Sequence, residues 1–384
     1  MRILLDLRCL ETGSAARGLG RHTRELTRVV REQAPAAVRV AGLSFTGGPA
    51  RELAVEDVRY PGPRRGITLA DRWLLPRLLQ HEEIDLYHAP AFGLPAKGAS
   101  ATALVLTVHD LIADVLPEML PLRARAAFRR IYRSAAVADR VIAVSETTRR
   151  DLLARYPVPA DRVVVVGNGV SAPFTAPTLV SVGHPRDPYL LYVGGLDPSK
   201  NVPFLLDVLA EVRRLVPSMR LALVGETGPR RDALAARAGA AGLAEAVDLL
   251  GYEDDARLAG TFRHATAFLF PSLYEGFGLP PLEAMAAGCP VVASPGGALP
   301  EILGDAAWIA PLGDAAAWAR AAVTLHRDVG RRLAQVEAGR ARAACFTWDR
   351  AAQKTWEVYR SLLDPPHEPA PEPVQEERPW PPVR

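Results

Sequence analysis

Short aliphatic runs alternate with longer amphipathic segments along most of the chain. Buried parallel strands are typically short and almost wholly apolar, whereas connecting helices repeat their apolar positions every three to four residues. The runs of the first half predict strands at 3–7, 38–45, 104–108, 141–144 and 163–166. Helical segments between most of these runs indicate a doubly wound α/β domain.

A second series of the same kind follows a stretch without periodicity. Residues 171–188 contain several Pro, Ser and Thr and look like a linker between domains. The strands predicted after it are 189–193, 221–224, 247–250, 267–270, 290–293 and 307–309, each followed by a loop that carries Gly or Pro. Two such domains would bind ligands at the carboxyl ends of their strands.

The chain therefore divides into an N-terminal Rossmann-like domain over 1–174, a linker over 175–188 and a C-terminal Rossmann-like domain over 189–346. A helix over 347–363 is expected to return toward the N-terminal domain. The tail over 364–384 is dense in Pro and Glu and is expected to be disordered, because it cannot bury a core.

Composition agrees with two globular domains. The chain has 384 residues, 49% of them hydrophobic and 23% charged. A net charge of +3 is too small for a global nucleic-acid signature, so no nucleic-acid partner is expected. Cys9, Cys289 and Cys345 lack metal-ligand or disulfide spacing, which is typical of a reducing, cytoplasmic environment. Asp6 and Arg8 interrupt the first apolar run, which argues against a secretory signal, and no stretch approaches membrane-spanning length.

The most informative segment sets two glutamates around a glycine-rich turn. Glu275 follows the apolar run 267–270, and Glu283 falls on the first turns of a helix that begins with a Pro-Pro pair. Gly276 and Gly278 let the backbone approach a ligand, and the free amides at the helix start can bind hydroxyls or phosphate oxygens. This mixture of donors and acceptors predicts a sugar-nucleotide site. Alternatively, Glu283 complements the helix dipole and Glu275 is an exposed loop carboxylate.

A second loop runs from Gly194 and Gly195 to Lys200, follows the first strand of the C-terminal domain and is expected to open a helix. This is the usual position for phosphate binding. A cation at a helix N-terminus opposes the helix dipole, so an anionic ligand explains Lys200 better than local stability does. The alternative is a solvated lysine.

The two glutamates, with Gly-Phe-Gly-Leu-Pro between them and Ala-Gly-Cys-Pro-Val-Val-Ala after them, resemble the signature of the retaining glycosyltransferases of family 4. The segment 296–301, Gly-Gly-Ala-Leu-Pro-Glu, resembles the continuation of that domain, and the similarity runs over residues 1–362. The resemblance implies the GT-B fold, an α/β architecture in which two Rossmann-like, doubly wound domains face one another across a cleft.

For the donor, the resemblance implies that Glu275 contacts the sugar ring, Glu283 holds the nucleotide's ribose and Lys200 binds the diphosphate. Many relatives have an arginine where this chain has Gly195, and Ser199 replaces another common basic residue. The remaining donor-binding candidates are Gly194, Gly276, Phe277, Gly278 and Leu279, with Arg230 or Arg231 as possible replacements for the missing cation. A solvated surface role explains either arginine equally well.

In the N-terminal domain, the resemblance implies that the loop with Gly18 and Gly20 closes near the donor phosphates and the acceptor, with Arg21 as an acceptor-side or phosphate candidate. His109 would approach the reacting carbon of the donor sugar, and Asp110 would orient the ring or contact the acceptor. A structural hydrogen-bonding role is the alternative for a lone His. Further matches to the family are Ser145, Glu146 and the Asn168-Gly turn, which turn chemistry explains equally well.

The leaving group implied is a nucleoside diphosphate, whose developing charge Lys200 and helix amides would stabilise. The expected catalytic residues are His109, Lys200 and Glu275. The Asp254-Asp255 pair is no Asp-X-Asp metal motif and suits a helix cap, so no metal and no other cofactor is expected. The family implies retention by a front-face mechanism, in which the acceptor hydroxyl loses its proton toward the leaving phosphate.

The expected function is transfer of a sugar from a nucleoside-diphosphate donor to a saccharide or lipid-linked saccharide, in cell-surface polysaccharide or glycolipid synthesis. The loop 196–201 resembles a subgroup with mannosyltransferases, which favours GDP-mannose over UDP-sugars. The missing arginine motivates one alternative, a non-catalytic sugar-nucleotide sensor or scaffold. Another, an NAD-linked enzyme, is disfavoured because no Gly-X-Gly-X-X-Gly spacing is present near the first strand.

Residues 122–137 predict a basic amphipathic helix. One face carries Ala124, Phe128, Ile131, Tyr132 and Ala135, and the other carries Arg123, Arg125, Arg129, Arg130 and Arg133. The apolar face either packs on the sheet of the first domain or docks to anionic lipid near a lipid-linked acceptor, which would place the protein at the inner face of the plasma membrane.

Overall fold

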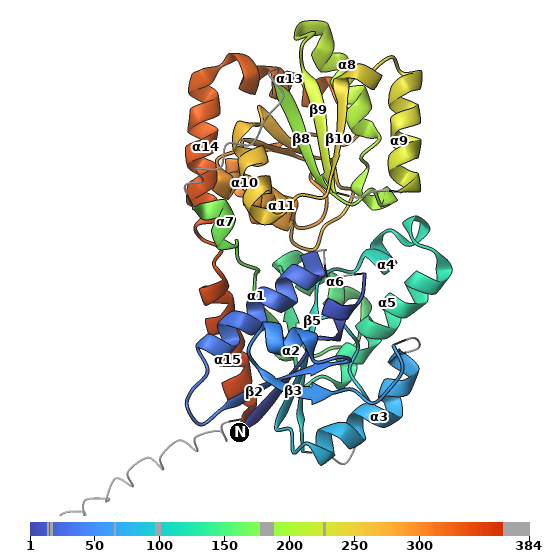
Figure 1. Ribbon diagram of the computed structural model, residues 1–384, viewed down its shortest axis with the longest axis vertical. Helices are drawn as coiled ribbons and strands as arrows, with labels where there is room; N and C mark the ends of the chain where they lie inside the picture. The colour runs from blue at the N-terminus through green and yellow to red at the C-terminus, as the bar shows by residue number, and fades with distance from the viewer. Residues whose placement is uncertain are drawn as a thin grey trace, which may run out of the picture.

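The computed structural model describes residues 1–13, 15, 18–64, 67–96, 101–176, 188–225 and 228–363. Two parallel sheets, one in each half of the chain, form the centres of two α/β domains stacked along the long axis (Figure 1). The predicted α/β fold with two doubly wound domains is confirmed. Most of the predicted linker and the Pro/Glu-rich segment 364–384 lie outside the described residues.

The described N-terminal sheet has the strand order β3-β2-β1-β4-β5-β6-β7, and every pairing in it is parallel. The order reverses between β1 and β4, which is the usual place for a ligand in a doubly wound sheet. Its strands are β1 (Arg2–Asp6), β2 (Arg39–Ser44), β3 (Glu56–Arg59), β4 (Leu86–Ala89), β5 (Ala103–Val108), β6 (Arg140–Ala143) and β7 (Val163–Val165).

The sequence pattern missed β3 and β4. Strand β3 lies at the sheet edge and buries only Val58, so three of its four residues are polar. Strand β4 is buried throughout but includes two polar aromatic residues, Tyr87 and His88, whose polar atoms are satisfied by other elements. The sequence pattern thus does not reveal β3 because the strand lies at an exposed edge. It does not reveal β4 because hydrogen bonds to other elements satisfy the polar residues of that strand.

The described C-terminal sheet has the order β10-β9-β8-β11-β12-β13, again parallel throughout. The apolar runs predicted each of these strands to within one residue at each end. They are β8 (Tyr189–Gly194), β9 (Arg220–Gly225), β10 (Val247–Gly251), β11 (Ala267–Phe270), β12 (Val291–Ala293) and β13 (Trp308–Ile309).

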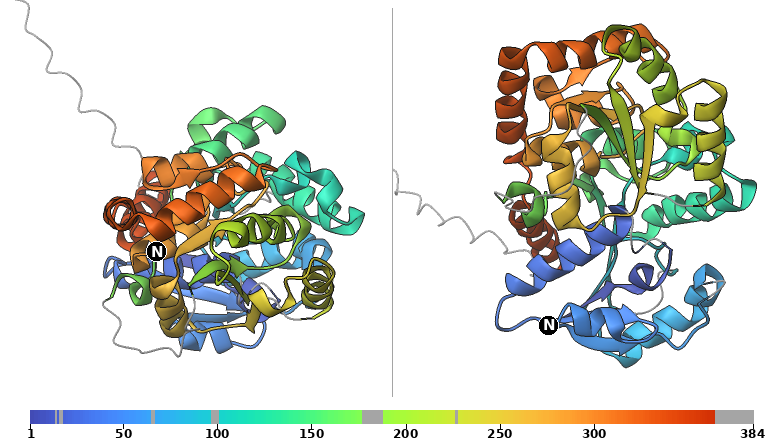
Figure 2. Two further views of the ribbon diagram at one scale, coloured as in Figure 1. Left: turned by 90° about the horizontal axis from the view of Figure 1, so that it is seen from above. Right: turned by 45° about the horizontal axis from the view of Figure 1, so that its top comes forward.

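Helices pack around both sheets (Figure 2). Those of the N-terminal half are α1 (Gly18–Glu32), α2 (Gly48–Glu52), α3 (Ile67–His81), α4 (Ile112–Val115), α5 (Leu122–Ser134), α6 (Glu146–Arg155) and α7 (Ala172–Thr175). Those that follow are α8 (Phe204–Leu215), α9 (Pro229–Ala240), α10 (Asp255–His264), α11 (Leu279–Ala287), α12 (Leu299–Leu303), α13 (Ala315–Arg327), α14 (Val329–Ala343) and α15 (Trp348–Leu363). Within the described residues, no helix is long and apolar enough to cross a membrane.

The last helix, α15, leaves the C-terminal domain and packs beside α1 (Figure 1). Trp356 is buried there and its Nε1 donates to the carbonyl of Val30 at 3.2 Å. The hydroxyl of Tyr359 lies 2.6 Å from Nδ1 of His88, on β4. The C-terminal helix therefore completes the core of the N-terminal domain.

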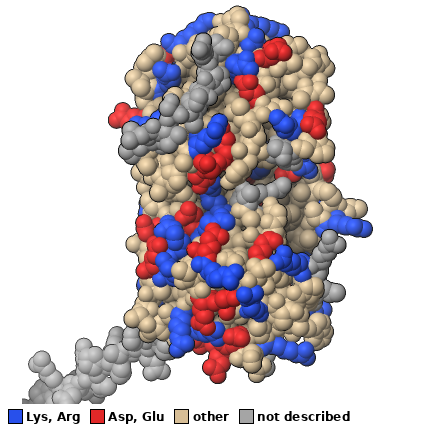
Figure 3. Space-filling model, in the orientation of Figure 1, with Lys and Arg blue, Asp and Glu red and all other residues tan. Residues whose placement is uncertain are grey.

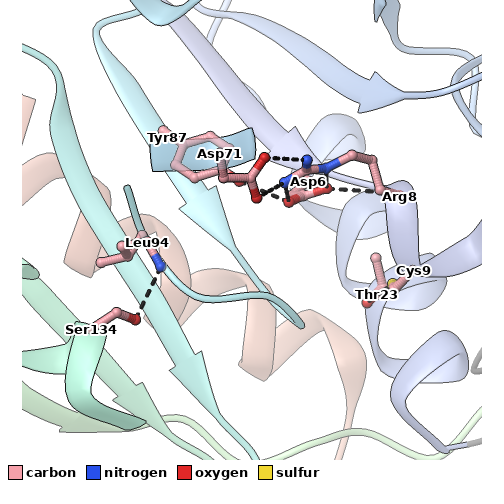
Figure 4. Close-up of polar contacts among 8 residues, drawn as sticks. All are labelled: Asp6, Arg8, Cys9, Thr23, Asp71, Tyr87, Leu94 and Ser134. Atoms are coloured by element: carbon pink, nitrogen blue, oxygen red, sulfur yellow. Dashed lines mark hydrogen bonds and ion pairs between the residues drawn. The ribbon is translucent and has the colours of Figure 1, made fainter. Parts of the chain in front are cut away.

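A buried ionic cluster fixes the carboxyl end of β1 (Figure 4). The guanidinium of Arg8 is fully buried and donates to the carboxylates of Asp6 and of Asp71, on α3, at 2.7–3.0 Å. The hydroxyl of Tyr87 donates to Asp6 Oδ2 at 2.7 Å. Buried charges persist only when they are paired and hydrogen-bonded, as they are here. The polar residues that interrupt the first apolar run thus join β1, β4 and α3.

Candidate active site between the two domains

The glycine-rich turn after β11 contacts the end of β5 in the other domain. A Cβ on Gly276 would overlap the carbonyl oxygen of His109 and would also approach Cβ of Asp110. Glycine is required here because the two backbones come so close together. The structure therefore brings the His-Asp step and the two-glutamate motif, which lie far apart in the sequence, into direct contact.

Lys200 and Glu275 form an ion pair. Lys200 Nζ donates to Glu275 Oε1 at 2.5 Å, and the hydroxyl of Ser272 donates to the same oxygen at 2.6 Å. Lys200 ends a short 3-10 turn, Pro198–Lys200, and α8 begins only at Phe204. The expectation that Lys200 stands at the start of a helix is therefore wrong, and a carboxylate rather than a helix dipole sets its local electrostatics.

Glu283 lies on α11 in a different setting. Only 4% of the residue is exposed, and its Oε1 accepts no hydrogen bond from the described residues. Nη1 of Arg21, on α1 of the other domain, lies 3.2 Å from that oxygen, but the guanidinium donates to Asp255 at 2.9 and 2.5 Å. Burial raises the pKa of Glu283 to about 7, with Asp255 adding to the rise and Arg21 opposing it. A buried carboxylate oxygen with unused acceptor capacity is suited to a ligand hydroxyl.

Two neutral histidines meet beside the turn. Nε2 of His109 donates to the carbonyl of Pro90 at 2.7 Å, and burial lowers the pKa of His109 to about 4. The ring of His22 lies edge-on to it, with centroids 4.6 Å apart. His22 is buried, its Nδ1 lies 2.8 Å from Oδ1 of Asn168, and burial together with His109 lowers its pKa. His22 carries no sequence signal of its own, because its position beside His109 arises only from tertiary packing.

Asp110 lies at the same strand end, and its described hydrogen bonds are to Ile112 and Tyr132 rather than to the His109 ring. Its Oδ1 accepts from the amide of Ile112 at 3.0 Å and from the hydroxyl of Tyr132 at 3.3 Å. Burial raises the pKa of Asp110, and the nearby charge of Glu275 raises it further. The described contacts thus assign Asp110 to the start of α4 and to the electrostatics of the site.

The glycines of the first loop have different surroundings. A Cβ on Gly18 would lie 3.8 Å from the side chain of Leu279, so the start of α1 lies beside the start of α11. A Cβ on Gly20 would overlap the backbone of Ala15, which makes glycine necessary for that turn. The ring of Phe277 packs edge-on against Phe346 at 5.7 Å and lies 3.3 Å from the position of a Cβ on Gly167, in the N-terminal domain. Gly18, Phe277 and Leu279 thus line the same domain boundary.

Of the two candidate arginines, Arg230 and Arg231, only Arg230 has a described hydrogen bond to the loop from Gly194 to Lys200. Nη1 of Arg230, on α9, donates to Asp197 Oδ1 at 2.8 Å, whereas Nη2 of Arg231 donates to the carbonyl of Leu249. The hydroxyl of Tyr192, on β8, donates to the carbonyl of Gly195 at 2.6 Å, just after Gly194 at the end of that strand. Arg230 is therefore the candidate arginine that contacts this loop, through Asp197.

Asp254 and Asp255, at the start of α10, have different roles. Asp254 caps the helix by accepting from the amide of Arg257 at 2.9 Å, which confirms the interpretation as a cap, and Asp255 pairs with Arg21. Among the residues that the structure describes, no group of three or more His, Cys, Asp or Glu side chains is arranged to hold a metal ion.

Comparisons with known proteins match both halves of the chain. Residues 16–172 match the profile of Glycosyltransferase Family 4, and residues 187–328 match that of Glycosyl transferases group 1. The chain is 32% identical over 323 residues to O-antigen chain mannosyltransferase B of Escherichia coli, with 81% of each chain covered. It is 31% identical over 320 residues to MMP alpha-(1->4)-mannosyltransferase of Mycolicibacterium hassiacum, with 79% of this chain and 76% of that relative covered.

Solved structures show the same fold. Anabaena HepE in complex with UDP-glucose matches with a TM-score of 0.73 at 20% identity, over 94% of this chain and 100% of that chain. The two facing Rossmann-like domains are thus those of the GT-B architecture. The matches in both halves of the sequence, together with the shared fold, show that the chain belongs to the family 4 glycosyltransferases.

Proposed function

We propose that this glycosyltransferase transfers mannose from GDP-mannose to a saccharide or lipid-linked saccharide acceptor, with retention of the anomeric configuration, in cell-surface polysaccharide or glycolipid synthesis. Its mannosyltransferase relatives support the choice of sugar. The observation that carries the proposal is the meeting of Glu275, Lys200 and Glu283 with His109 at one domain boundary.

The donor would lie along the C-terminal side of this boundary. Glu283 would accept from the ribose hydroxyls with its Oε1, which accepts no hydrogen bond from the described residues, and Lys200 would contact the diphosphate, assisted by Arg230. Glu275 would then contact the sugar being transferred. Lys200 already lies 2.5 Å from Glu275, so one cation can interact with both the sugar-binding carboxylate and the leaving phosphate.

Sugar transfer would proceed by cleavage of the bond between the anomeric carbon and the β-phosphate oxygen. The electron pair of that bond leaves with the diphosphate, whose developing charge Lys200 and Arg230 stabilise. The acceptor oxygen forms the new bond on the same face, and its proton passes to the leaving phosphate. His109 is neutral and its Nε2 is held by Pro90, so its role is to shape the reacting centre rather than to exchange that proton.

We assign no metal to this reaction, because Lys200 supplies the positive charge at the phosphate. Turnover should be unchanged after treatment with EDTA and buffer exchange. Loss of turnover that Mg²⁺ or Mn²⁺ restores would overturn this part of the proposal.

The surface of α5 suggests where a lipid-linked acceptor would approach. Tyr132 is buried, so the predicted apolar face packs in part on the N-terminal domain. Leu122 and Phe128 nevertheless remain 72% and 37% exposed, and Trp73 on α3 is 64% exposed. Acidic and basic groups are mixed over the face shown in Figure 3, so a membrane-binding role would depend on this local combination of arginines and apolar side chains rather than on overall charge.

A donor panel tests the sugar transfer. Thermal shift and hydrolysis are measured with GDP-mannose and with UDP-, ADP- and dTDP-sugars, using Glu275→Gln as the impaired variant and Glu245→Gln, an exposed glutamate, as its matched control. The proposal expects turnover with GDP-mannose that Glu275→Gln loses and the control keeps. Turnover only with another nucleotide sugar would overturn the choice of mannose, and binding without transfer to any acceptor would support a sensor.

Vesicle binding tests the membrane contact. Charge reversal at the exposed residues Arg130 and Arg133 should reduce binding to vesicles that contain phosphatidylglycerol, because each basic residue near an anionic surface contributes about 1 kcal/mol. Donor hydrolysis should be unaffected. The matched control reverses Arg214 and Arg237, exposed arginines of the other domain. Equal vesicle binding by both double variants would show that α5 has only a solvated basic face.

A further inference from the structure

A carboxylate of the C-terminal domain completes the N-terminus of a helix in the other domain. Glu301 lies on α12, and α6 lies at the domain boundary (Figure 1). Oε1 of Glu301 accepts from the amide of Glu146 at 2.8 Å, and Oε2 accepts from the amide and the hydroxyl of Thr147 at 2.9 and 2.8 Å. Such amides have no partner inside their own helix, and a negative charge at this end is favoured by the helix dipole.

The same end of α6 also holds the glycine-rich turn. The buried hydroxyl of Ser145 donates to the carbonyl of Gly276 at 2.7 Å, and the hydroxyl of Thr148 lies 3.2 Å from that carbonyl. One turn further along α6, Asp151 Oδ2 accepts from the hydroxyl of Tyr274 at 2.7 Å. The residues immediately before and after Glu275 are therefore both anchored to the opposite domain.

We propose that α6 and Glu301 form a cross-domain clamp that positions Glu275 for sugar transfer. The clamp consists of Ser145, Thr147, Thr148 and Asp151 on one side and of Tyr274, Gly276 and Glu301 on the other. Its hydrogen bonds can form only when the domains are closed, since each bond joins one domain to the other. Closure thus fixes the Glu275 loop against His109, so Glu301 and Tyr274 are positioning residues that act through this loop.

The clamp is separate from the features that hold each domain together. Each sheet has an extensive apolar core, and residues of the clamp such as Glu301 and Thr147 are not part of these cores. The diphosphate candidate Lys200 and the ribose candidate Glu283 make none of the clamp's hydrogen bonds. Loss of the clamp should therefore impair closure and turnover while leaving folding and binding of the bare nucleotide largely intact. This inference rests on the sugar transfer of the family but not on the identity of the sugar.

Amide exchange tests the clamp without any substrate. In Glu301→Ala, the amides of Glu146 and Thr147 should exchange hydrogen about tenfold faster than in the unmodified protein, because their acceptor is lost. The matched control is Asp305→Ala, which removes an exposed carboxylate just after α12, the helix that carries Glu301. Unchanged exchange of these two amides in Glu301→Ala would overturn the clamp, whatever the outcome of the donor panel.

Kinetics separates positioning from binding. With the nucleotide sugar that the panel identifies, Glu301→Ala should lower kcat about tenfold or more, while the Kd for the bare nucleoside diphosphate changes by less than about threefold. Glu301→Gln, which keeps one acceptor oxygen, should recover part of kcat. Tyr274→Phe removes only the hydroxyl bonded to Asp151 and should lower kcat in the same direction. A loss of nucleotide affinity as large as the loss of kcat, or a normal kcat in both Glu301→Ala and Tyr274→Phe, would overturn the positioning role.

Discussion

The two glutamates of one motif lie in opposite electrostatic environments. Glu275 has a cation and a hydroxyl on the same oxygen, both from the C-terminal domain. Glu283 is more deeply buried, and its Oε1 accepts no hydrogen bond from the described residues. Arg21, a residue of the N-terminal domain, lies 3.2 Å from that oxygen but donates to Asp255. Glu275 is thus organised before a ligand arrives, whereas Glu283 keeps an acceptor for one.

This difference suggests how the site divides its work. A preorganised carboxylate suits a contact that matters most in the transition state, since little reorganisation is then needed during the reaction. A buried carboxylate with spare acceptor capacity suits ground-state recognition of hydroxyls. The predictions that follow test this division between Glu275 and Glu283.

The largest effect is expected for turnover in Glu275→Gln. Turnover of the full donor should fall about a hundredfold or more, because a charged contact to the reacting sugar is lost. The Kd for the bare nucleoside diphosphate, measured by calorimetry, should change little. A loss of diphosphate affinity as severe as that of Glu283→Gln would refute the division of labour.

The complementary variant is Glu283→Gln, which should weaken the bare diphosphate and the full donor equally. A charged hydrogen bond to the ribose is worth about 1.5–3 kcal/mol, so Kd should rise about 10- to 150-fold. Calorimetry with both ligands measures this. Selective loss of the full donor alone would show that Glu283 contacts the sugar instead of the ribose.

Lys200→Ala should weaken the bare diphosphate by about tenfold, at the lower end of the range for a charged hydrogen bond. The loss is moderated because Lys200 is already paired with Glu275 before the ligand arrives. Titration calorimetry measures the Kd, with Lys354→Ala, an exposed lysine of α15, as the control. An unchanged Kd in Lys200→Ala would remove this lysine from the diphosphate site.

The smallest effect concerns pH. Because the pKa of Glu283 is raised to about 7, the carboxyl group is mostly protonated at pH 6 and mostly charged at pH 8. Affinity for the diphosphate should therefore rise through pH 7, by less than about tenfold. The raised pKa also affects stability. Between the ordinary pKa of 4.5 and about 7, the folded state binds more protons at Glu283 than the unfolded state does, so the contribution of Glu283 to the free energy of unfolding falls as pH rises.

Glu283→Gln supplies the control for this pH profile, since it cannot titrate. The ligand's own phosphate titration remains in both proteins and cancels in the comparison. Identical pH dependence of diphosphate binding in the two proteins would show that Glu283 is not the titrating group.

The sequence by itself predicted the α/β class, the C-terminal strands and the two-glutamate motif. This was possible because β11, its turn and α11 are contiguous, so their apolar run, glycines and Pro-Pro pair are read in a single window. It also predicted a helix cap at the Asp254-Asp255 pair, a role that Asp254 fills and that depends only on neighbouring residues. Local chemistry of this kind needs no knowledge of distant contacts.

Tertiary structure alone decided which residues face one another. Glu283 and Arg21 are 262 positions apart, and Glu301 and Thr147 are 154 apart, so no local pattern links either pair. The environment of Lys200 was misjudged because its partner, Glu275, comes from another loop of the same sheet edge. Burial, the pKa of Glu283 and the clamp on Glu275 arise only where the two domains meet, which is why the sequence predicted the motifs but not their electrostatics.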